Sequence, residues 1–436
     1  WRISEENFFS DSSIAQWMTN LKLRLSYGQL GDDNISGYGN FDHLSTYNYG
    51  ESAVISNNPF NQTNGKIVRG IYQGNLPVTN LTWIKTNLSN IGMDWGFLNN
   101  RLSLEVDGFY RKREGLAARK AGVTLPNETG FTMPIENLNT DMHMGVDGFI
   151  KWRDNAAGFQ YYVAVNATFA RKKDGESWGQ SFANSWDEYR SSIQSRWAYI
   201  NWGYQVIGRF RTQEEIDAYP VIMNLTNGSD GNIPVLPGDL IYKDVNRDGV
   251  IDGYDSRPIG YAEGGLPYLT YGLNSGIVWK QFDLAVDFVG ATMQSFQQNY
   301  ETKWPFQADG NTYEFMASDR WRHEDPLDPS SPWIEGYYPA LRLQPTDAWH
   351  NYCNNSTYWF TNLRYLRLRN LELGYTVPKL LTTKVSIEQL RLYFSGTNLF
   401  SWDNISHLGL DPENNDTNGL GYPNNRVMTI GATVTF

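Results

Sequence analysis

The chain has 436 residues, enough for one large domain or two to three ordinary ones, and aromatic residues make up 15% of it. Its mean hydropathy is -0.51 and no apolar run reaches the length of a spanning helix, which argues against a helical membrane protein. A net charge of -11 argues against nucleic acid as a partner, and the single cysteine, Cys353, excludes an internal disulfide framework.

The N-terminal part predicts strands whose two faces differ in polarity. The sequence begins without Met or a signal peptide, so we interpret it as a fragment or the mature part of something longer; residues 1–20 resemble the end of an earlier strand plus a periplasmic turn. In 21–27, Leu and Tyr alternate with Lys, Arg and Ser, which predicts a strand with a basic inner face.

The clearest hairpin lies at 90–110. Apolar residues alternate with polar ones in 90–97 and again in 102–110, and Asn99-Asn100 between them tolerates the positive φ of a tight turn. The second strand directs Glu105 and Asp107 inward. Because carboxylates in a hydrophobic core are costly, this face favours a water-filled lumen.

The same alternation recurs to the end of the chain. The last segment places apolar residues against Thr and Gly and ends on Phe436, which is typical of an outer-membrane barrel, although an edge strand of a soluble sandwich gives the same pattern. The alternation slips near Asn370, where we predict a β-bulge. The further predicted strands are 138–152, 159–172, 266–279, 282–288, 358–376, 390–400 and 427–436.

Loop lengths favour the barrel over the sandwich. If the last residue lies at the periplasmic end, short and long connections alternate along the chain, which puts short turns on one rim and long loops on the other. The prediction is an all-β, transmembrane antiparallel β-barrel to which this chain gives about ten strands. The short connections are 99–100, 153–158, 280–281 and 377–388, and the long, extracellular ones are about 30–82, 116–137, 173–265, 294–357 and 401–426.

Three segments inside the long loops have structure of their own. Residues 66–73 predict a short strand. Residues 197–211 look like a strand, but a membrane-spanning strand there would break the alternation, so we assign them to the 173–265 loop. Residues 212–219 predict a short helix capped by Thr212.

One segment has the spacing of a calcium loop. In 244–255 oxygen donors recur at the EF-hand positions, with Gly249 at the sharp turn. The last donor is Asp where an EF-hand has Glu, so we expect weaker calcium binding. The ion would staple the 173–265 loop; the alternative is a surface loop rich in Asx turns and without an ion. The predicted ligands are Asp244, Asn246, Asp248, Val250 through its carbonyl, Asp252 and Asp255.

No enzyme motif is present, so we predict no catalytic residues. The five His residues fit no metal or triad spacing, and Glu214-Glu215 is interpreted as part of a solvated helix. Aromatic residues in the 173–265 and 294–357 loops suit sugar or peptide ligands, or contacts with a lid. Alternatively, they pack these long loops into a stable body. The residues predicted to contact ligand or lid are Trp304, Trp321, Trp333, Tyr337 and Tyr338.

Five sequence stretches resemble the SusC/RagA family of TonB-dependent outer-membrane transporters. They keep the family's order along nearly the whole chain. They are LKLRLSYGQLGDDNI at 21–35, the hairpin NLSNIGMDWGFLNNRLSLEVDGFY at 87–110, GDLIYKDVNRDGVID at 238–252, LRYLRLRNLELGYTVP at 363–378 and LRLYFSGTNLF at 390–400.

The resemblance implies a 22-stranded barrel with an N-terminal plug in the outer membrane of a Gram-negative bacterium. It implies energy from the TonB-ExbB-ExbD system, a SusD-like lipoprotein as a lid, and an oligosaccharide or peptide as cargo. The TonB box, the plug and the early strands are not in this sequence, and ten strands cannot close such a wall alone, so the remaining segment is an expected partner.

The sequence therefore leaves two functions to compare. The first is TonB-dependent active import of oligosaccharides or peptides. The alternative is a secreted or surface binding or adhesion protein, rich in β-structure and stabilised by calcium, without transport. A surface glycosidase is a third reading, which the missing motifs disfavour.

Overall fold

The computed structural model describes residues 1–33, 41–55, 66–123, 125–129, 131, 133–156, 158–223, 225, 235–262, 265–307, 310–342, 351–383 and 386–436. Ten long strands form one antiparallel sheet in the order β1-β4-β5-β6-β7-β14-β15-β18-β19-β20. The strands are β1 (Met18–Asp32), β4 (Ile84–Phe97), β5 (Leu102–Ala118), β6 (Glu136–Ala156), β7 (Phe159–Asp174), β14 (Leu269–Trp279), β15 (Phe282–Gln297), β18 (Phe360–Thr376), β19 (Gln389–Asp403) and β20 (Val427–Thr435).

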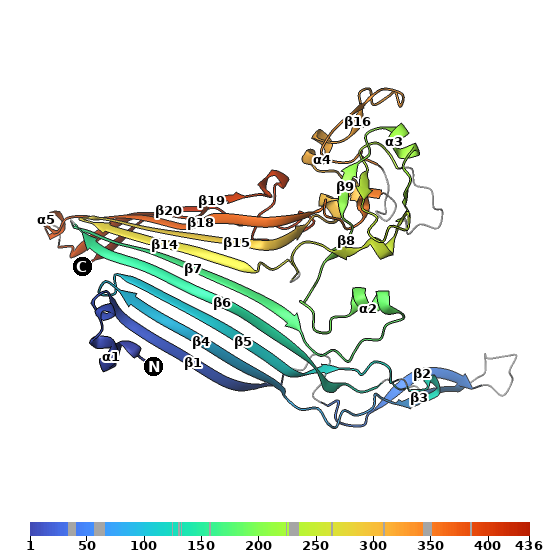
Figure 1. The fold of residues 1–436 in the computed structure, drawn as a ribbon, viewed down its shortest axis with the longest axis horizontal. Helices are drawn as coiled ribbons and strands as arrows, with labels where there is room; N and C mark the ends of the chain where they lie inside the picture. The colour runs from blue at the N-terminus through green and yellow to red at the C-terminus, as the bar shows by residue number, and fades with distance from the viewer. Residues whose placement is uncertain are drawn as a thin grey trace.

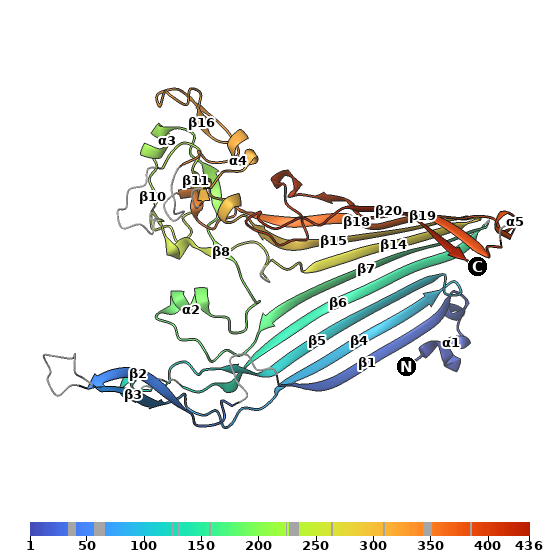
Figure 2. The ribbon, with the colours of Figure 1, turned by 180° about the vertical axis from the view of Figure 1, so that it is seen from behind.

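The sheet is curved and has two ends of different character (Figure 1). Both termini and the short turns lie at one end, and the long loops lie at the other, as the reverse view also shows (Figure 2). The predicted ten strands and their short connections are thus confirmed, but several strands are longer than expected: β1 continues to Asp32, β5 to Ala118 and β15 to Gln297. Strands β1 and β20 are the two edges, and they do not pair with each other in the part of the chain described here.

The short turns use the residues that their backbone requires. Leu98, Asn99 and Asn100 between β4 and β5 all have positive φ, between 53° and 60°, and Lys280 between β14 and β15 has φ 54°. Asn adopts this region at little cost, which is why the first turn was visible in the sequence. The register shift between Leu368 and Asn370 in the pairing of β18 with β19 confirms the predicted bulge.

The first residues form a single bridge to β1, where the sequence predicted the end of an earlier strand followed by a turn. Arg2 forms an antiparallel bridge with Lys22, and the Trp1 and Leu23 backbones exchange two hydrogen bonds of 2.8 Å. Between this bridge and β1 the chain forms short helices. They are η1 (Ile3–Glu5), α1 (Asn7–Ser10) and η2 (Ser13–Gln16).

The long loops contain only short elements outside the large sheet. Hairpin β2 (Tyr47–Ile55) with β3 (Lys66–Gln73) confirms the strand predicted at 66–73. Helix α3 (Gln213–Asp217) is capped by Thr212, whose hydroxyl accepts a 3.2 Å bond from Glu215 N, as predicted. Segment 197–211 contributes only β8 (Trp202–Gly203) and β9 (Val206–Arg209), neither of which joins the large sheet.

The other short elements of these loops are α2 (Ser185–Ser191), β10 (Ile222–Met223), β11 (Leu240–Tyr242), β12 (Val250–Ile251), β13 (Arg257–Pro258), α4 (Glu314–Ser318), β16 (Arg322–His323) and β17 (Trp333–Ile334). Helix α5 (Lys379–Thr382) lies in the short connection between β18 and β19. Short 3-10 helices are η3 (Asn127–Thr129), η4 (Gly253–Asp255), η5 (Tyr300–Thr302), η8 (Asn351–Cys353) and η10 (Ser406–Leu408). None of the described helices combines the length and apolar character that a membrane crossing requires.

The strand register sorts the side chains into two faces. Directly paired residues share a face, so one cross-strand row can be followed from β1 to β19. That row is apolar throughout and consists of Leu21, Trp95, Leu104, Ile150, Val165, Leu273, Phe288, Leu368 and Phe400. A row three residues farther along β1, on the other face, contains Arg24, Gly92, Asp107, Asp147, Thr168 and Thr270.

The apolar face of the described sheet is largely open to solvent, although Leu368 in its apolar row is only 4% exposed. Ile91 is 57% exposed and Ile430 87% exposed. Soluble monomers rarely expose a contiguous apolar surface of this extent, whereas the outside of a membrane barrel is apolar. The core of the protein lies instead at the long-loop end, where the 173–265 and 294–357 loops pack together into what we call the loop body. Tyr242 and Trp359 are fully buried there.

Candidate functional site

The polar face of the sheet carries two guanidinium–carboxylate clusters. Arg24 on β1 donates from Nε to Asp94 at 2.8 Å and from Nη1 and Nη2 to Asp107 at 2.8 and 2.6 Å, which connects three strands. Arg391 on β19 pairs with Asp283 on β15 and with Glu372 on β18. Charged groups that are paired and still partly open to solvent fit a wet interior surface.

Each cluster lies over a glycine that leaves room for it. A Cβ built on Gly92 would come within 2.9 Å of Arg24 Cζ and still closer to Asp107 Oδ1. A Cβ on Gly374 would come within 2.5 Å of Arg391 Nη2 and of Asp283 Oδ2. Glycine weakens a strand interior, so its presence at these two positions needs a reason, and the space that it leaves for the ion pairs provides one.

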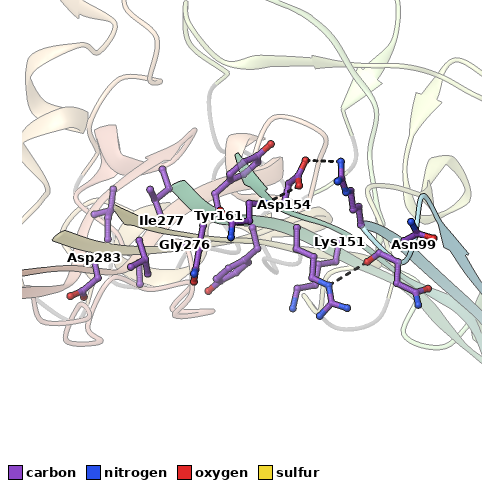
Figure 3. Close-up of a pocket in the computed structure, with 16 residues that line it drawn as sticks. Asn99, Lys151, Asp154, Tyr161, Gly276, Ile277 and Asp283 are labelled. Carbon is purple, nitrogen blue, oxygen red and sulfur yellow. Dashed lines mark hydrogen bonds and ion pairs between the residues drawn. The ribbon is translucent and has the colours of Figure 1, made fainter. Parts of the chain in front are cut away.

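A cavity of about 700 Å³ opens near the short-turn end (Figure 3). Its lining comes from the β4–β5 turn, β6, β7, β14 and β15. Arg101 pairs with Asp154 at 3.4 Å, and Lys151 lies 5.2 Å from the ring centroid of Tyr162. Figure 3 shows Ile277 and Asp283 on opposite sides of the sheet, in agreement with the alternation along each strand. The cavity is open to solvent, and one part of its lining carries the charged side chains of Arg101, Lys151 and Asp154. These residues do not form a catalytic arrangement.

The loop body brings the 173–265 and 294–357 loops together around one core. Its buried residues are Leu240, Tyr242, Ile251, Met316, Tyr338, Tyr352, Cys353 and Trp359. Asp239 is 0% exposed and pairs at 2.5 Å with Arg342 from the other loop. Burial raises the pKa of Asp239, and the Arg342 guanidinium opposes that rise.

The predicted contact residues divide into a buried and an exposed group. Trp321 and Tyr338 are 3% and 4% exposed. Tyr338 belongs to the core of the loop body, where burial raises its pKa to about 12, and Trp321 is buried against Gly238. Trp304 packs half-buried against the same core, and Trp333 stacks on His323 at 4.0 Å. Tyr337 is 51% exposed. Packing therefore accounts for Trp321 and Tyr338, and Tyr337 has the surface that a ligand needs.

Tyr337 belongs to a cluster that the sequence did not suggest. Arg209 lies 5.2 Å from the ring of Tyr337 and 4.9 Å from that of Tyr358, and donates to Gly336 O at 2.8 Å. Tyr337 and Tyr358 stack at 5.4 Å. Burial raises the pKa of Tyr358 strongly, so this phenol stays neutral and donates a 2.5 Å bond to Tyr337 O. The three residues come from distant segments, so no local pattern could have grouped them.

The predicted calcium loop is closed by its own hydrogen bonds. Asp244 accepts bonds from Arg247 N at 2.5 Å and Gly249 N at 2.9 Å, and Gly249 has the expected positive φ of 81°. Asp255, 1% exposed, accepts from Val245 N at 2.7 Å. Across the described ranges, no three His, Cys, Asp or Glu side chains form a group that could hold a metal ion. The donors do not form a coordination shell in this arrangement, and calcium stays a prediction.

Comparisons with known proteins agree with this architecture. The whole chain aligns with the TonB-dependent receptors P26 and P3 of Formosa agariphila at 26% identity and with the TonB-dependent receptor SusC of Bacteroides thetaiotaomicron at 24%. The resemblance to the SusC/RagA family is confirmed. No family model matches the chain.

The SusC/RagA likeness extends to the fold. The RagAB peptide importer in its open-open state matches the whole chain with a TM-score of 0.66 at 19% identity, and the closed-closed state matches with 0.64. The chain spans 41% of the length of the P26 receptor and 42% of the RagAB chain. The named relatives are receptors and importers, in line with the prediction that the chain is not an enzyme.

Proposed function

We propose that this chain is part of a transporter that imports oligosaccharides or peptides across the outer membrane of a Gram-negative bacterium by a TonB-dependent mechanism. The supporting observation is the two-faced sheet: an apolar row, mostly open or partly open to solvent, crosses from β1 to β19, and ion-paired side chains occupy the other face. A soluble binding protein has no need of either feature.

The proposal requires partners. The unpaired outer edges of β1 and β20 would aggregate if they stayed open, so we propose that a further barrel segment with a plug completes the wall. That segment would carry the connection to TonB-ExbB-ExbD. A SusD-like surface lipoprotein would cover the long-loop end as a lid.

The cargo contact that the geometry favours is the Arg209, Tyr337 and Tyr358 cluster. Stacked phenol rings beside a guanidinium present flat apolar faces and fixed hydrogen-bond donors, which suit a sugar ring or a peptide backbone. Trp333 is a second candidate because it is only half-buried. We propose that the calcium loop, if it binds an ion, stabilises the loop body and takes no part in transport.

Uptake by the full-length protein tests this function. Cells that express it with its lipoprotein partner should accumulate labelled oligosaccharides or peptides, and collapse of the proton-motive force should stop the accumulation. The purified protein should need detergent and show heat-modifiable mobility in gels. A protein that stays soluble without detergent and binds ligand without uptake would support the adhesion alternative instead.

A further inference from the structure

The apolar face carries a groove of about 940 Å³ across β1, β4, β5, β6 and β7, on the long-loop side of the sheet. Figure 1 shows these strands side by side. The groove floor includes Gly108, where a Cβ would meet only Ile91, with Cγ2 at 3.6 Å and the carbonyl oxygen at 3.9 Å. Its apolar walls stay open: Leu25 is 70% and Val146 51% exposed. This shape suits a hydrocarbon chain.

The rows of side chains above the groove change from apolar, through a mixed row that contains two Tyr, to a mostly polar row. The row Leu25, Ile91, Gly108, Val146 and Phe169 is apolar, and the next row outward is Tyr27, Ser89, Tyr110, Met144 and Arg171. The row beyond it is Gln29, Asn87, Lys112, Met142 and Lys173. Aromatic side chains followed by polar and cationic ones mark the level of lipid headgroups.

Within the described part of the chain, two cations at this level have no carboxylate partner. The Arg171 guanidinium lies between the rings of Trp197, at 3.7 Å, and Tyr268, at 4.4 Å, and its Nη2 donates to the Tyr268 hydroxyl at 3.2 Å. Its Nε is buried without a hydrogen-bond acceptor. Among the described residues neither Arg171 nor Lys173 forms an ion pair, whereas Lys112 in the same row as Lys173 pairs with Glu114 at 2.6 Å.

An uncompensated guanidinium at the edge of a low-dielectric layer needs an anion from outside the chain. An aromatic cradle holds Arg171 in place, so little side-chain entropy would be lost when an anion binds. The groove directly below it accepts an apolar chain. The anion and the chain therefore belong to one molecule.

We propose that this groove binds a phosphate-bearing, acylated lipid of the outer leaflet. Arg171 and Lys173 hold the phosphate, and an acyl chain lies in the groove over Gly108. The proposal rests on the proposed membrane orientation, with the long loops outward, and makes no use of cargo.

The test is a lipid titration of the full-length complex, delipidated in detergent and followed by native mass spectrometry. The probes are lipid A, lipid A without its phosphates, and inorganic phosphate. We expect the wild type to retain lipid A, and Arg171→Gln and Lys173→Gln each to weaken retention about fivefold. Gly108→Leu should fill the groove and weaken it by a similar factor. The matched control is Lys280→Gln, which removes a cation stacked 4.8 Å from Trp279 at the opposite rim and should change nothing.

Three results would overturn the proposal: equal retention by the wild type and both cation variants, equal retention of lipid A with and without phosphates, or saturable binding of inorganic phosphate alone. The last result would indicate a free-anion site. Because the titration needs no cargo, lipid binding can fail while uptake by the wild type persists. Conversely, loss of uptake with lipid binding intact would count against the transport function alone.

Discussion

Gly92→Ala tests whether the polar face is held together by ion pairs that depend on a missing side chain. The new methyl group would approach Arg24 Cζ to 2.9 Å and Asp107 Oδ1 more closely, and both contacts are shorter than real Cβ atoms tolerate. The two-pronged contact between Arg24 and Asp107 must therefore break or shift. Hydrogen bonds to charged groups contribute about 1.5–3 kcal/mol, reduced here because Arg24 is 32% exposed. Replacing Gly in a strand returns roughly 0.5–1 kcal/mol, so the net cost is about 1 kcal/mol.

The control is Gly108→Ala on the adjacent strand and the opposite face, where the nearest atom to a new Cβ is 3.6 Å away. That substitution should be neutral or slightly stabilising. Denaturant or thermal unfolding of the full-length protein in detergent, followed by gel mobility, measures both. Gly92→Ala should cost little in an Arg24→Ala background, because the contact it disturbs is already gone. Equal effects of the two glycine substitutions, or an undiminished cost in that background, would refute the reasoning.

Four further predictions concern the loops. Asp239→Ala removes the buried carboxylate that pairs with Arg342 and should destabilise the loop body by about 3 kcal/mol, seen as faster proteolysis of the 173–265 loop. Unchanged proteolysis would refute the stabilising role of this ion pair. Burial works against the ionised form of Asp411, but hydrogen bonds from Arg367 and from backbone N–H groups lower its pKa overall. A lowered folded-state pKa contributes stability that is present above the unfolded value of about 3.9 and is lost as pH falls through the folded value, so Asp411→Asn should matter at pH 7 and not at acid pH in unfolding experiments. Tyr337→Ala should lower cargo affinity several-fold by calorimetry with unfolding unchanged, because the side chain is 51% exposed. Asp244→Ala should expose the 244–255 segment to protease even with chelator present, because two backbone hydrogen bonds are lost. Added calcium should protect only the wild type, and equal protection of both proteins would refute the predicted calcium site.

The sequence predicted the large sheet well because alternation is a local property. Side chains of a strand point to opposite faces with a period of two, so an apolar and a polar face can be read directly from 90–97 or 427–436. The turn at Asn99-Asn100 and the cap at Thr212 are also local, since each depends on the conformational preference of one or two residues. The slip of the pattern near Asn370 marked the bulge for the same reason.

The loop body could not be predicted in the same way. Its core joins residues more than a hundred positions apart, such as Leu240 and Trp359, and no periodic pattern records such a contact. Aromatic residues were correctly associated with these loops, but composition does not distinguish Trp321, which is buried, from Tyr337, which faces solvent. Arg209 and Tyr358 were missed because their chemistry arises only when the loops meet.

The contrast between local strand alternation and long-range loop packing also separates the barrel wall from the residues that would select the cargo. In the proposed transporter, strand alternation would create a wall with lipid on one side and water on the other, and this requirement would constrain nearly every second residue from β1 to β20. The exposed residues of the loop body, which would determine cargo specificity, have no such constraint. The loop body needs only a core large enough to hold these residues in place. Cargo selection would then depend on a few exposed side chains such as Tyr337, while the buried Asp239–Arg342 pair and the core around Trp359 keep them in position. Exchange of surface residues in this body should therefore alter the cargo without disturbing the wall.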